Sequence, residues 1–504
     1  MKKIIMSIKK FIWSLFNKDK RTHVLTYDEL VKALNEGNKE IVLDKDISCA
    51  APLQIDSEVT IDGDGHRIFC RQERQGFALD EDTFCSSLHL AESRVEHEDG
   101  TEVKLSEKGA GVFRIATLLS KKEVERHQYI NFSCGWTAYT LPIVKYENGY
   151  IYFRSYGTDY CVDFDWYQGN SKKFTEYRLI YCGQTQYSKY AISLKSGAKV
   201  EMKNMELRGG VFVSEGANLR LDKCDMMFCT EFGINAQSKS NVVVVDCYFC
   251  HTWKSAIKSK GSIYVRNSTF ANVNHGRQNT GAIDCEGDAV IVDNYLLNYG
   301  SLGIRVGKVK AMIKDECPSV TVISNTLTLD RSLANQGIVT DTGAIYLAAN
   351  SSFATIKNNV IAGYKGRGNN HAIYCDDGAY NFEVSGNKIT NCPTGYAISS
   401  RCADPSKTPR GYAGGVPNTN RLIADNYCES GIWFGGNADV ADNKCVYKNN
   451  VVHENTKYKT KLSNVKIIND GKIDKAQQIK NRCDRPMPDA TNECVNYEYD
   501  NENY

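Results

Sequence analysis

The chain has almost no net charge. Its 504 residues include 62 Lys and Arg against 60 Asp and Glu, a formal net charge of +2. Proteins that bind nucleic acid through electrostatics carry a clear positive excess on the binding domain, and a balanced chain lacks it. The composition therefore predicts no nucleic-acid partner.

The chain also lacks a long apolar segment. A helix that spans a bilayer needs about 20 mostly apolar residues in a row, and no stretch of the sequence reaches that length. Residues 1–21 place Ile and Phe at helical spacing, but Lys9 and Lys10 interrupt them and no small-residue cleavage site follows, so a standard secretion signal is not expected. Two alternatives stay open for this segment: a basic amphipathic helix in weak contact with a membrane surface, or a helix that covers the end of the fold.

The 19 cysteines show no disulfide framework. Cys285 and Cys375 occupy core positions of short strands, and Cys224 and Cys247 occupy matching places of successive repeats. Buried free thiols behave as small hydrophobic side chains, so most of the cysteines are expected to be free. Free thiols indicate synthesis in a reducing compartment, and a periplasmic or extracellular location stays open.

No metal or cofactor is expected. The spacing of Cys224 with Cys229 and of Cys247 with Cys250 is close to that of a zinc ribbon, but the repeat accounts for both pairs. No cluster of acidic residues has the pattern of a Ca²⁺ site.

The sequence does contain a repeat. Residues 343–351 and 371–379 are near-copies of one phrase, in which a small residue and an Ile precede alternating strand positions and a Gly, Asn or Asp turn. Ten copies are centred on Ile192, Val211, Ile234, Ile257, Ile283, Ile304, Ile345, Ile373, Ile398 and Ile432. A short strand repeated at such intervals is typical of a solenoid.

The positions of the repeat predict an all-β fold, a right-handed parallel β-helix. A Gly or Ala always precedes the central residue, which indicates a bend where stacked backbones crowd. The residue two places after the centre is almost always small or apolar, and strand alternation puts it on the same inward face. A column of amides is expected to hydrogen-bond between turns; we assign to it Asn267, Asn294, Asn325, Asn359, Asn387, Asn426 and Asn443.

The chain divides into five predicted parts. Residues 26–29 form a capping box for a short helix, which is expected to cover the first turns of the solenoid. A stretch of alternating, half-buried strands then interrupts the repeat and predicts an inserted antiparallel domain. The parts are the basic segment 1–21, the capping helix and first turns 22–81, the inserted β-rich domain 82–190, the β-helix 191–452, and a cap with an acidic tail 453–504.

The outward positions of the strands mix acids, bases and aromatic rings, which suits an extended sugar. Long loops at residues 308–319, 328–342, 363–370 and 403–420 cluster around the strands of Ile345, Ile373 and Ile398, and such loops usually surround a binding site. The candidate substrate-binding residues are Asp284, Glu286, Arg305, Tyr346, His371, Tyr374, Arg401 and Trp433.

Three aspartates are the candidate catalytic residues. Glycosidic bond cleavage uses two carboxyl groups about 5 to 9.5 Å apart. Asp376 and Asp377 end one strand, and Asp341 begins the strand one turn earlier. Asp376 is expected to act as base or nucleophile beside Arg401, and Asp377 or Asp341 as the acid.

Residues 341–346 followed by residues 371–379 resemble the paired strand motifs of β-helical glycoside hydrolases, a group with the pectate-lyase-like fold. The segments 25–64 and 113–153 resemble their first turns and inserted β-domain. The resemblance implies an exo-acting glycosidase whose acids lie at Asp341, Asp376 and Asp377, although Cys375 replaces the usual aliphatic residue.

Three functions are compatible with the sequence. The first is hydrolysis of an oligo- or polysaccharide. The second is a polysaccharide lyase, in which Lys258, Lys260 or Arg305 would act next to a uronate. The third is a non-catalytic, tailspike-like protein that only binds a glycan.

Overall fold

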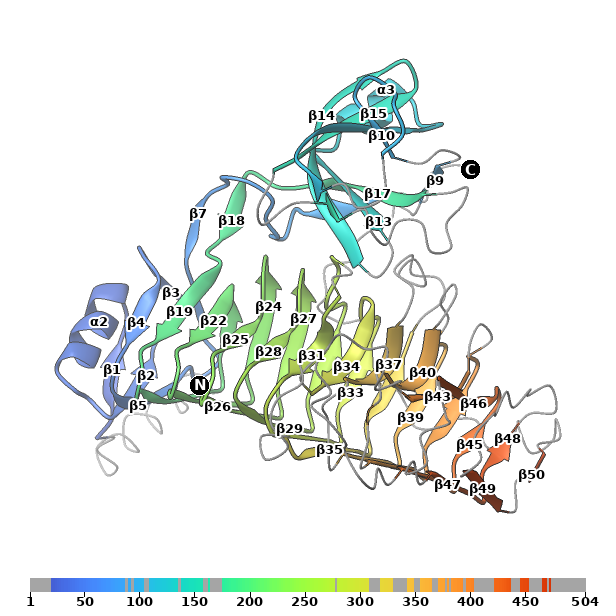
Figure 1. Cartoon of the computed structure of the whole chain (residues 1–504). Helices are drawn as coiled ribbons and strands as arrows, with labels where there is room; N and C mark the ends of the chain where they lie inside the picture. The colour runs from blue at the N-terminus through green and yellow to red at the C-terminus, as the bar shows by residue number, and fades with distance from the viewer. Residues whose placement is uncertain are drawn as a thin grey trace, which may run out of the picture.

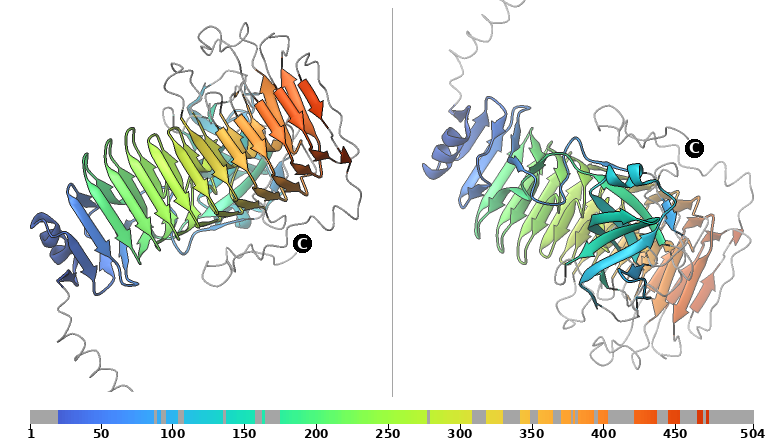
Figure 2. Two further views of the ribbon diagram at one scale, coloured as in Figure 1. Left: turned by 90° about the horizontal axis from the view of Figure 1, so that it is seen from below. Right: turned by 90° about the horizontal axis from the view of Figure 1, so that it is seen from above.

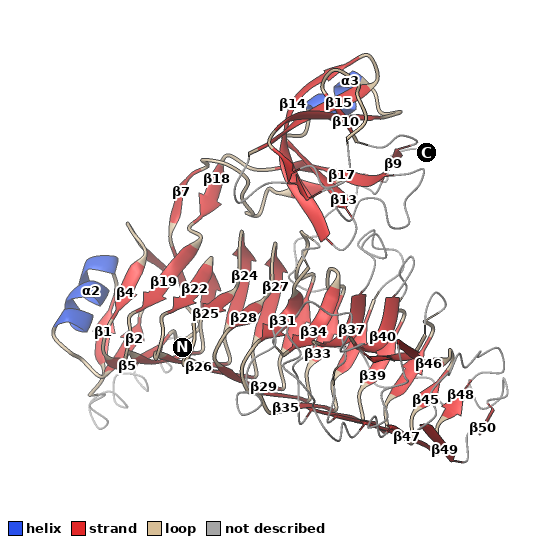
Figure 3. Cartoon of the chain, in the orientation of Figure 1, coloured by secondary structure: helices blue, strands red, loops and turns tan. Residues whose placement is uncertain are grey.

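The structure is a computed structural model built almost entirely of strands (Figure 3). It describes residues 20–86, 89–91, 95–103, 108–134, 137–156, 162–163, 175–276, 279–307, 318–329, 342–348, 354–364, 370–376, 379, 382–392, 396–402, 421–436, 445–452, 465–468 and 471–472.

Three parallel sheets run along the molecule (Figure 1; Figure 2, left). Sheet A contains β1 (Thr22–Val24), β2 (Glu40–Leu43), β5 (Glu58–Asp62), β20 (Lys199–Lys203), β23 (Asn218–Asp222), β26 (Asn241–Val245), β29 (Ser262–Arg266), β32 (Ala289–Val292), β35 (Val320–Ile323), β38 (Ala354–Lys357), β41 (Phe382–Ser385), β44 (Arg421–Ala424), β47 (Cys445–Lys448) and β49 (Val465–Ile468). Sheet B contains β3 (Ile47–Ser48), β6 (Arg67–Phe69), β21 (Glu206–Arg208), β24 (Asp225–Cys229), β27 (Tyr248–Thr252), β30 (Thr269–Ala271), β33 (Tyr295–Leu297), β36 (Thr326–Thr328), β39 (Val360–Ala362), β42 (Lys388–Thr390), β45 (Tyr427–Cys428), β48 (Val451–Val452) and β50 (Gly471–Lys472). Sheet C contains β4 (Leu53–Ile55), β19 (Tyr190–Leu194), β22 (Gly210–Val213), β25 (Ile234–Ala236), β28 (Ile257–Ser259), β31 (Gly281–Cys285), β34 (Leu302–Val306), β37 (Thr342–Leu347), β40 (Asn370–Cys375), β43 (Ile398–Cys402) and β46 (Ile432–Gly436).

Each turn of the chain visits sheets A, B and C in that order, so the fold is the predicted parallel β-helix. The central residues stack in register, since Ile283 pairs with Ile304, Ile304 with Ile345, and Ile345 with Ile373. All four are fully buried in one continuous core. The period of the sequence therefore identified the interior correctly.

The small residue before each centre lies where backbones crowd, as predicted. A Cβ on Gly210 would lie 2.4 Å from the carbonyl oxygen of Phe232, and one on Gly303 would lie 2.5 Å from that of Ala344. Larger side chains are excluded from this position because the carbonyl of a neighbouring segment occupies their place.

A ladder of amides lines the corner between sheets A and B. The backbone N–H of each ladder residue before the last donates to the side-chain oxygen of the ladder residue one turn later, for example Asn325 to Asn359 at 2.9 Å. Each amide also donates to a carbonyl one turn earlier, as Asn359 does to Val322 at 2.9 Å. The ladder residues are Asn294, Asn325, Asn359, Asn387, Asn426 and Asn450.

One described residue of the predicted column does not belong to the ladder. Asn267 lies one place earlier, at the corner itself, with a left-handed φ of 49°. The next residue, Ser268, continues the ladder by donating its backbone N–H to Asn294, and Cys247 donates to Ser268 in the same way. Asn443 lies outside the described residues, and the ladder residue that follows Asn426 is Asn450, which we did not assign to the column from the sequence.

The N-terminal end of the solenoid is covered by α2 (Tyr27–Asn35), which begins at the predicted cap residue Thr26. At the other end the solenoid extends beyond the predicted boundary at residue 452. Strands β49 and β50 pair in parallel with β47 and β48 and add to sheets A and B. Among the described helices, none has the length and apolarity needed to cross a membrane.

The inserted strands form an antiparallel sheet with its own core, and this sheet lies over the middle of the solenoid (Figure 1; Figure 2, right). Over the described residues it contains β8 (Phe84–Cys85), β9 (His89–Ala91), β10 (Glu96–His97), β12 (Gly111–Ala116), β13 (Tyr129–Cys134), β14 (Thr137–Glu147), β15 (Tyr150–Ser155) and β17 (Thr175–Tyr181). A helix, α3 (Lys121–Glu125), and a separate pair, β11 (Lys108–Gly109) with β16 (Val162–Asp163), accompany it.

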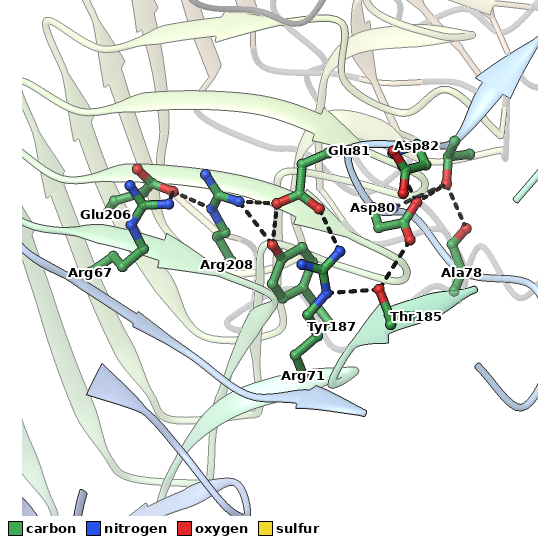
Figure 4. A network of polar contacts seen from close by, with 11 residues as sticks. Arg67, Arg71, Ala78, Asp80, Glu81, Asp82, Thr185, Tyr187, Glu206 and Arg208 are labelled. Carbon is green, nitrogen blue, oxygen red and sulfur yellow. Dashed lines mark hydrogen bonds and ion pairs between the residues drawn. The ribbon is translucent and has the colours of Figure 1, made fainter. Parts of the chain in front are cut away.

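The inserted domain is joined to the solenoid by an arm of two antiparallel strands, β7 (Arg71–Glu73) and β18 (Thr185–Tyr187). At its base, Glu81 forms ion pairs with Arg71 and Arg208 and accepts a hydrogen bond from the Tyr187 hydroxyl (Figure 4). Burial alone would raise the pKa of Glu81, but the Tyr187 hydrogen bond and the two guanidinium groups lower it overall. The carboxylate therefore ties the arm to sheet B.

A second attachment is a buried polar contact between the domain and the turns that lead from sheet B to sheet C. Arg178, only 1% exposed, donates to Asn131 at 3.2 Å and to the backbone carbonyl of His275. Its guanidinium lies 5.4 Å from the ring centroid of Trp253, against which Phe77 also packs. Burial, together with the nearby guanidinium, lowers the pKa of His275. These contacts attach the inserted domain to the connections between sheets B and C.

Twelve cysteines in the described part of the chain are free and buried, which agrees with the prediction of free thiols. Cys224 and Cys247 stack at the A–B corner, where the N–H of Cys224 contacts the sulfur of Cys247 at 3.4 Å. Burial raises the pKa of Cys182 and of Cys285 to about 12, so these thiols stay protonated in the folded protein.

We expect Asn359→Ala to destabilise the protein by at least about 2 kcal/mol, because it removes the acceptor of one buried N–H and the donor to one buried carbonyl. Thermal unfolding followed by circular dichroism measures the effect. Asn241→Ala, at an exposed position that begins β26, is the matched control and should leave the midpoint nearly unchanged. Equal midpoints for the two variants would contradict a stabilising role for the ladder.

Thiol titration should separate the folded and unfolded states. Without reductant, the native protein at mildly alkaline pH should react slowly with a thiol reagent because its described thiols are buried. After unfolding in denaturant, a majority of the 19 cysteines should react. A fully oxidised set would show that the chain matures in an oxidising compartment.

Candidate functional site

The outward face of sheet C brings five of the predicted site residues, Asp284, Arg305, Tyr346, Tyr374 and Trp433, into one row. The pairing register aligns Lys258 with Asp284, Asp284 with Arg305, and Arg305 with Tyr346. The row continues through Tyr374 and Ser399 to Trp433. Its first half is therefore ionic and its second half mostly aromatic.

The ionic half is a closed set of contacts around Asp284, which is fully buried. Its two oxygens lie 3.3 Å from the Lys258 ammonium and 3.6 Å from Nε of Arg305. The N–H of Gly281 donates to the same carboxylate at 3.1 Å. Glu286, more exposed, lies 3.9 Å from Lys258. Asp284 is thus compensated within the protein, and only the edge of this cluster is accessible to a ligand.

The aromatic half contains two kinds of ring contact. Tyr346 and Tyr374 meet edge to face at 5.4 Å, and His371 meets Tyr374 in the same way at 4.5 Å. Trp433 lies nearly parallel to His371 and to Tyr396, with centroids 6.4 and 6.0 Å away. Tyr374 and His371 are buried, so Tyr346, Tyr396 and Trp433 form the accessible part of this surface.

Tyr396 was missed by sequence reasoning. It precedes the small residue Ala397 as His371 precedes Ala372, and it therefore occupies the same place one turn later. Comparison of these two places in the repeat would have identified it as a neighbour of His371.

Burial lowers the pKa of His371 to about 4 and outweighs the opposing effect of a backbone contact with Tyr396. The ring is therefore neutral at neutral pH. A neutral imidazole packs beside Trp433 without a charge to solvate, so it can support the partly exposed indole from the buried side.

Asp376 follows β40 at the edge of the aromatic half. It is 2% exposed and accepts a hydrogen bond from the Tyr346 hydroxyl at 2.6 Å. Its backbone is fixed on both sides, because its N–H donates to Leu347 at 3.1 Å and its carbonyl accepts from Ala379 at 2.9 Å. Asp284 and Glu286 lie three turns away, so they belong to a separate part of the row.

The remaining predicted site residues lie outside the description. Asp341 and Asp377 are not among the described residues, and neither are most of the loops that flank them. Arg401 lies in β43, next to the place of Asp376, but its side chain is not described. The described side chains include no group of three or more His, Cys, Asp or Glu residues arranged to hold a metal ion.

A family model described as the right-handed beta helix region matches residues 167–327. With the three parallel sheets and the antiparallel insertion, it confirms the predicted fold class. No curated protein matches the chain.

Solved structures with a similar course of the chain include one described as a glycoside hydrolase, at 10% sequence identity and a TM-score of 0.39, covering 88% of this chain and 90% of that one. The Gp54 tailspike of Acinetobacter baumannii bacteriophage AP22, solved with a capsular saccharide, has 9% identity, a TM-score of 0.19 and coverages of 90% and 77%. The tailspike gp49 from Pseudomonas phage LKA1 has 10% identity, a TM-score of 0.20 and coverages of 88% and 74%. Similarity at this level carries no information about the site of this chain.

Acid should weaken the fold through His371. The unfolded ring titrates near 6.5 and the folded ring near 4, so the unfolded chain binds more protons between these values and stability falls as pH falls through this window. His371→Gln should remove up to about 3 kcal/mol of that loss. The measurement compares melting temperatures at pH 7 and pH 4. Equal decreases in melting temperature from pH 7 to pH 4 in the wild type and the variant would contradict the lowered pKa of His371. The control variant is His66→Gln, in the first turns of the solenoid.

Proposed function

We propose that the protein binds a glycan along the outer face of sheet C and hydrolyses a glycosidic bond beside Asp376. The observation that carries this proposal is the carboxyl group of Asp376 next to the surface of Tyr346, Tyr396 and Trp433. Sugar rings pack their apolar faces on aromatic side chains, and a nearby carboxylate supplies the base that hydrolysis needs.

The row of side chains explains why an extended ligand suits this surface. Strands of sheet C follow one another at about 4.8 Å, so the aromatic half from Tyr346 to Trp433 spans several strands in a straight line. A chain of sugar units laid along this line would reach the ionic half at Arg305 and Glu286. Those partly exposed groups would then hydrogen-bond hydroxyl groups of neighbouring units.

In this mechanism Asp376 serves as the base, and Asp341 or Asp377 protonates the leaving oxygen. The acid comes from the loop side of the site, as the sequence indicates. Two carboxyl groups in different surroundings divide the roles of acid and base, since a less polar environment keeps one of them protonated.

The arrangement of charges favours hydrolysis over the lyase alternative. A lyase would need Lys258, Lys260 or Arg305 to act on a uronate. The side chains of Lys258 and Arg305 are directed at the buried carboxylate of Asp284, which leaves the exposed Lys260 as the remaining candidate of the three. Release of reducing ends without an unsaturated, ultraviolet-absorbing product distinguishes the two reactions.

The proposal is tested with a panel of bacterial and plant polysaccharides, assayed for reducing ends. We expect Asp376→Asn and Asp341→Asn each to lower turnover at least roughly a hundredfold, as for a lost base or acid. Both variants should keep the circular dichroism spectrum and melting temperature of the wild type.

Glu286→Gln is the comparison variant, because this acid lies on the same face three turns away and should affect turnover far less. An equal or larger loss in Glu286→Gln would move the site toward the N-terminus. Binding of a glycan with no turnover by the wild type would instead identify a binding protein, with Trp433 as its sugar platform.

A further inference from the structure

The carboxyl group of Asp376 is not itself on the surface. The side chain is 2% exposed, whereas Tyr346 is only half-buried and its hydroxyl donates to Oδ2 of Asp376 at 2.6 Å. A water molecule or a sugar that approaches sheet C at this point therefore meets the tyrosine before the carboxylate. A base must lie within hydrogen-bond reach of the proton that it removes, and here the phenol oxygen meets that condition better.

We propose that Tyr346 is a catalytic residue that relays a proton from the attacking water to Asp376. This inference rests on the proposed hydrolysis and adds to it the group that touches the reacting water. The relay requires a phenol held in one orientation and a carboxylate at short distance, and both are present.

The orientation is set by packing and by the backbone. The ring of Tyr346 meets the buried ring of Tyr374 edge to face at 5.4 Å. The two tyrosines also pair in register on adjacent strands, β37 and β40. Asp376 is anchored through its N–H to Leu347, the residue that follows Tyr346. Donor and acceptor are therefore fixed to the same two strands, which limits the rearrangement needed during the reaction.

The proton transfers balance as follows. Water attacks the anomeric carbon, and one of its protons passes to Oη of Tyr346 while the proton of that hydroxyl passes to Oδ2 of Asp376. The glycosidic C–O bond breaks with its electron pair on the leaving oxygen, which takes a proton from the acid at Asp341 or Asp377. Tyr346 ends as a neutral phenol. Asp376 ends protonated and the acid ionised, and proton exchange with solvent restores both.

The deciding variant is Tyr346→Phe, which keeps the ring and removes only the hydroxyl. On a polysaccharide that the wild type hydrolyses, we expect kcat to fall at least roughly a hundredfold, with KM and melting temperature unchanged. A tyrosine that served only to pack would leave kcat unchanged, because Phe makes the same edge-to-face contact.

Tyr190→Phe is the matched control. Tyr190 lies in β19 of the same sheet, and its hydroxyl also forms a side-chain hydrogen bond of 2.6 Å, which it accepts from the amide of Asn235. This variant loses a comparable contact far from Asp376 and should keep the kcat of the wild type. Equal losses in the two variants would show a general effect of removing a phenol from sheet C and would overturn the relay.

The outcomes separate the relay from the proposed function. If Asp376→Asn is inactive while Tyr346→Phe keeps the wild-type kcat, hydrolysis stands and the relay is wrong, because Asp376 then contacts the water directly. If the wild type releases reducing ends from no polysaccharide in the panel, both the function and the relay are rejected.

Discussion

The corner between sheets A and B constrains the rest of the solenoid. In most turns the chain bends from sheet A to sheet B at a residue with a left-handed φ, such as Asp293 at 58° and Asn358 at 54°. Asn, Asp and Gly adopt this conformation most readily. The N–H of the residue that follows would otherwise be buried without an acceptor. The amide ladder supplies that acceptor from the next turn, so each corner is completed by its neighbour. Successive turns are thereby locked into one register.

This register gives the site its form. Because the same corner repeats in each turn, neighbouring strands of sheet C pair in register. Outward side chains from different turns therefore form a straight row. The loops that leave sheet C can vary in length without disturbing the row, since the corner, rather than the loop, fixes where the next strand begins. A change of residue type along the row, from Lys258 and Asp284 to Tyr346 and Tyr374, then converts an ionic surface into an aromatic one within a few turns.

The sequence was sufficient to predict which residues share a column of the repeat, but not which side chains of different columns contact each other. The Ile column, the small residues that precede it and the outward row all follow from strand alternation, and the structure confirms them. Asn267 was misassigned because both the corner and the ladder favour asparagine, and pattern alone does not separate adjacent positions. The burial of Asp376 beneath Tyr346 depends on side-chain rotamers across two strands, which periodicity does not encode. The sequence did not predict the role of Arg178, because this role arises only from the contact between the inserted domain and the solenoid.

The position of the insertion also sets an order for folding. Strands β4, β5 and β6 pair directly with β19, β20 and β21, so the turns before and after the insertion are immediate neighbours. The first turns pair locally with one another, as Ile41 does with Ile61, but they join the rest of the solenoid only across more than 100 residues, for instance from Val59 to Val200. Turns beyond β21 contact partners close to them in the sequence. Closing a long loop costs entropy before any contact compensates for it. We therefore expect the uninterrupted turns to form first, and the N-terminal turns with their capping helix to dock onto them after the inserted domain has folded and brought its two ends together.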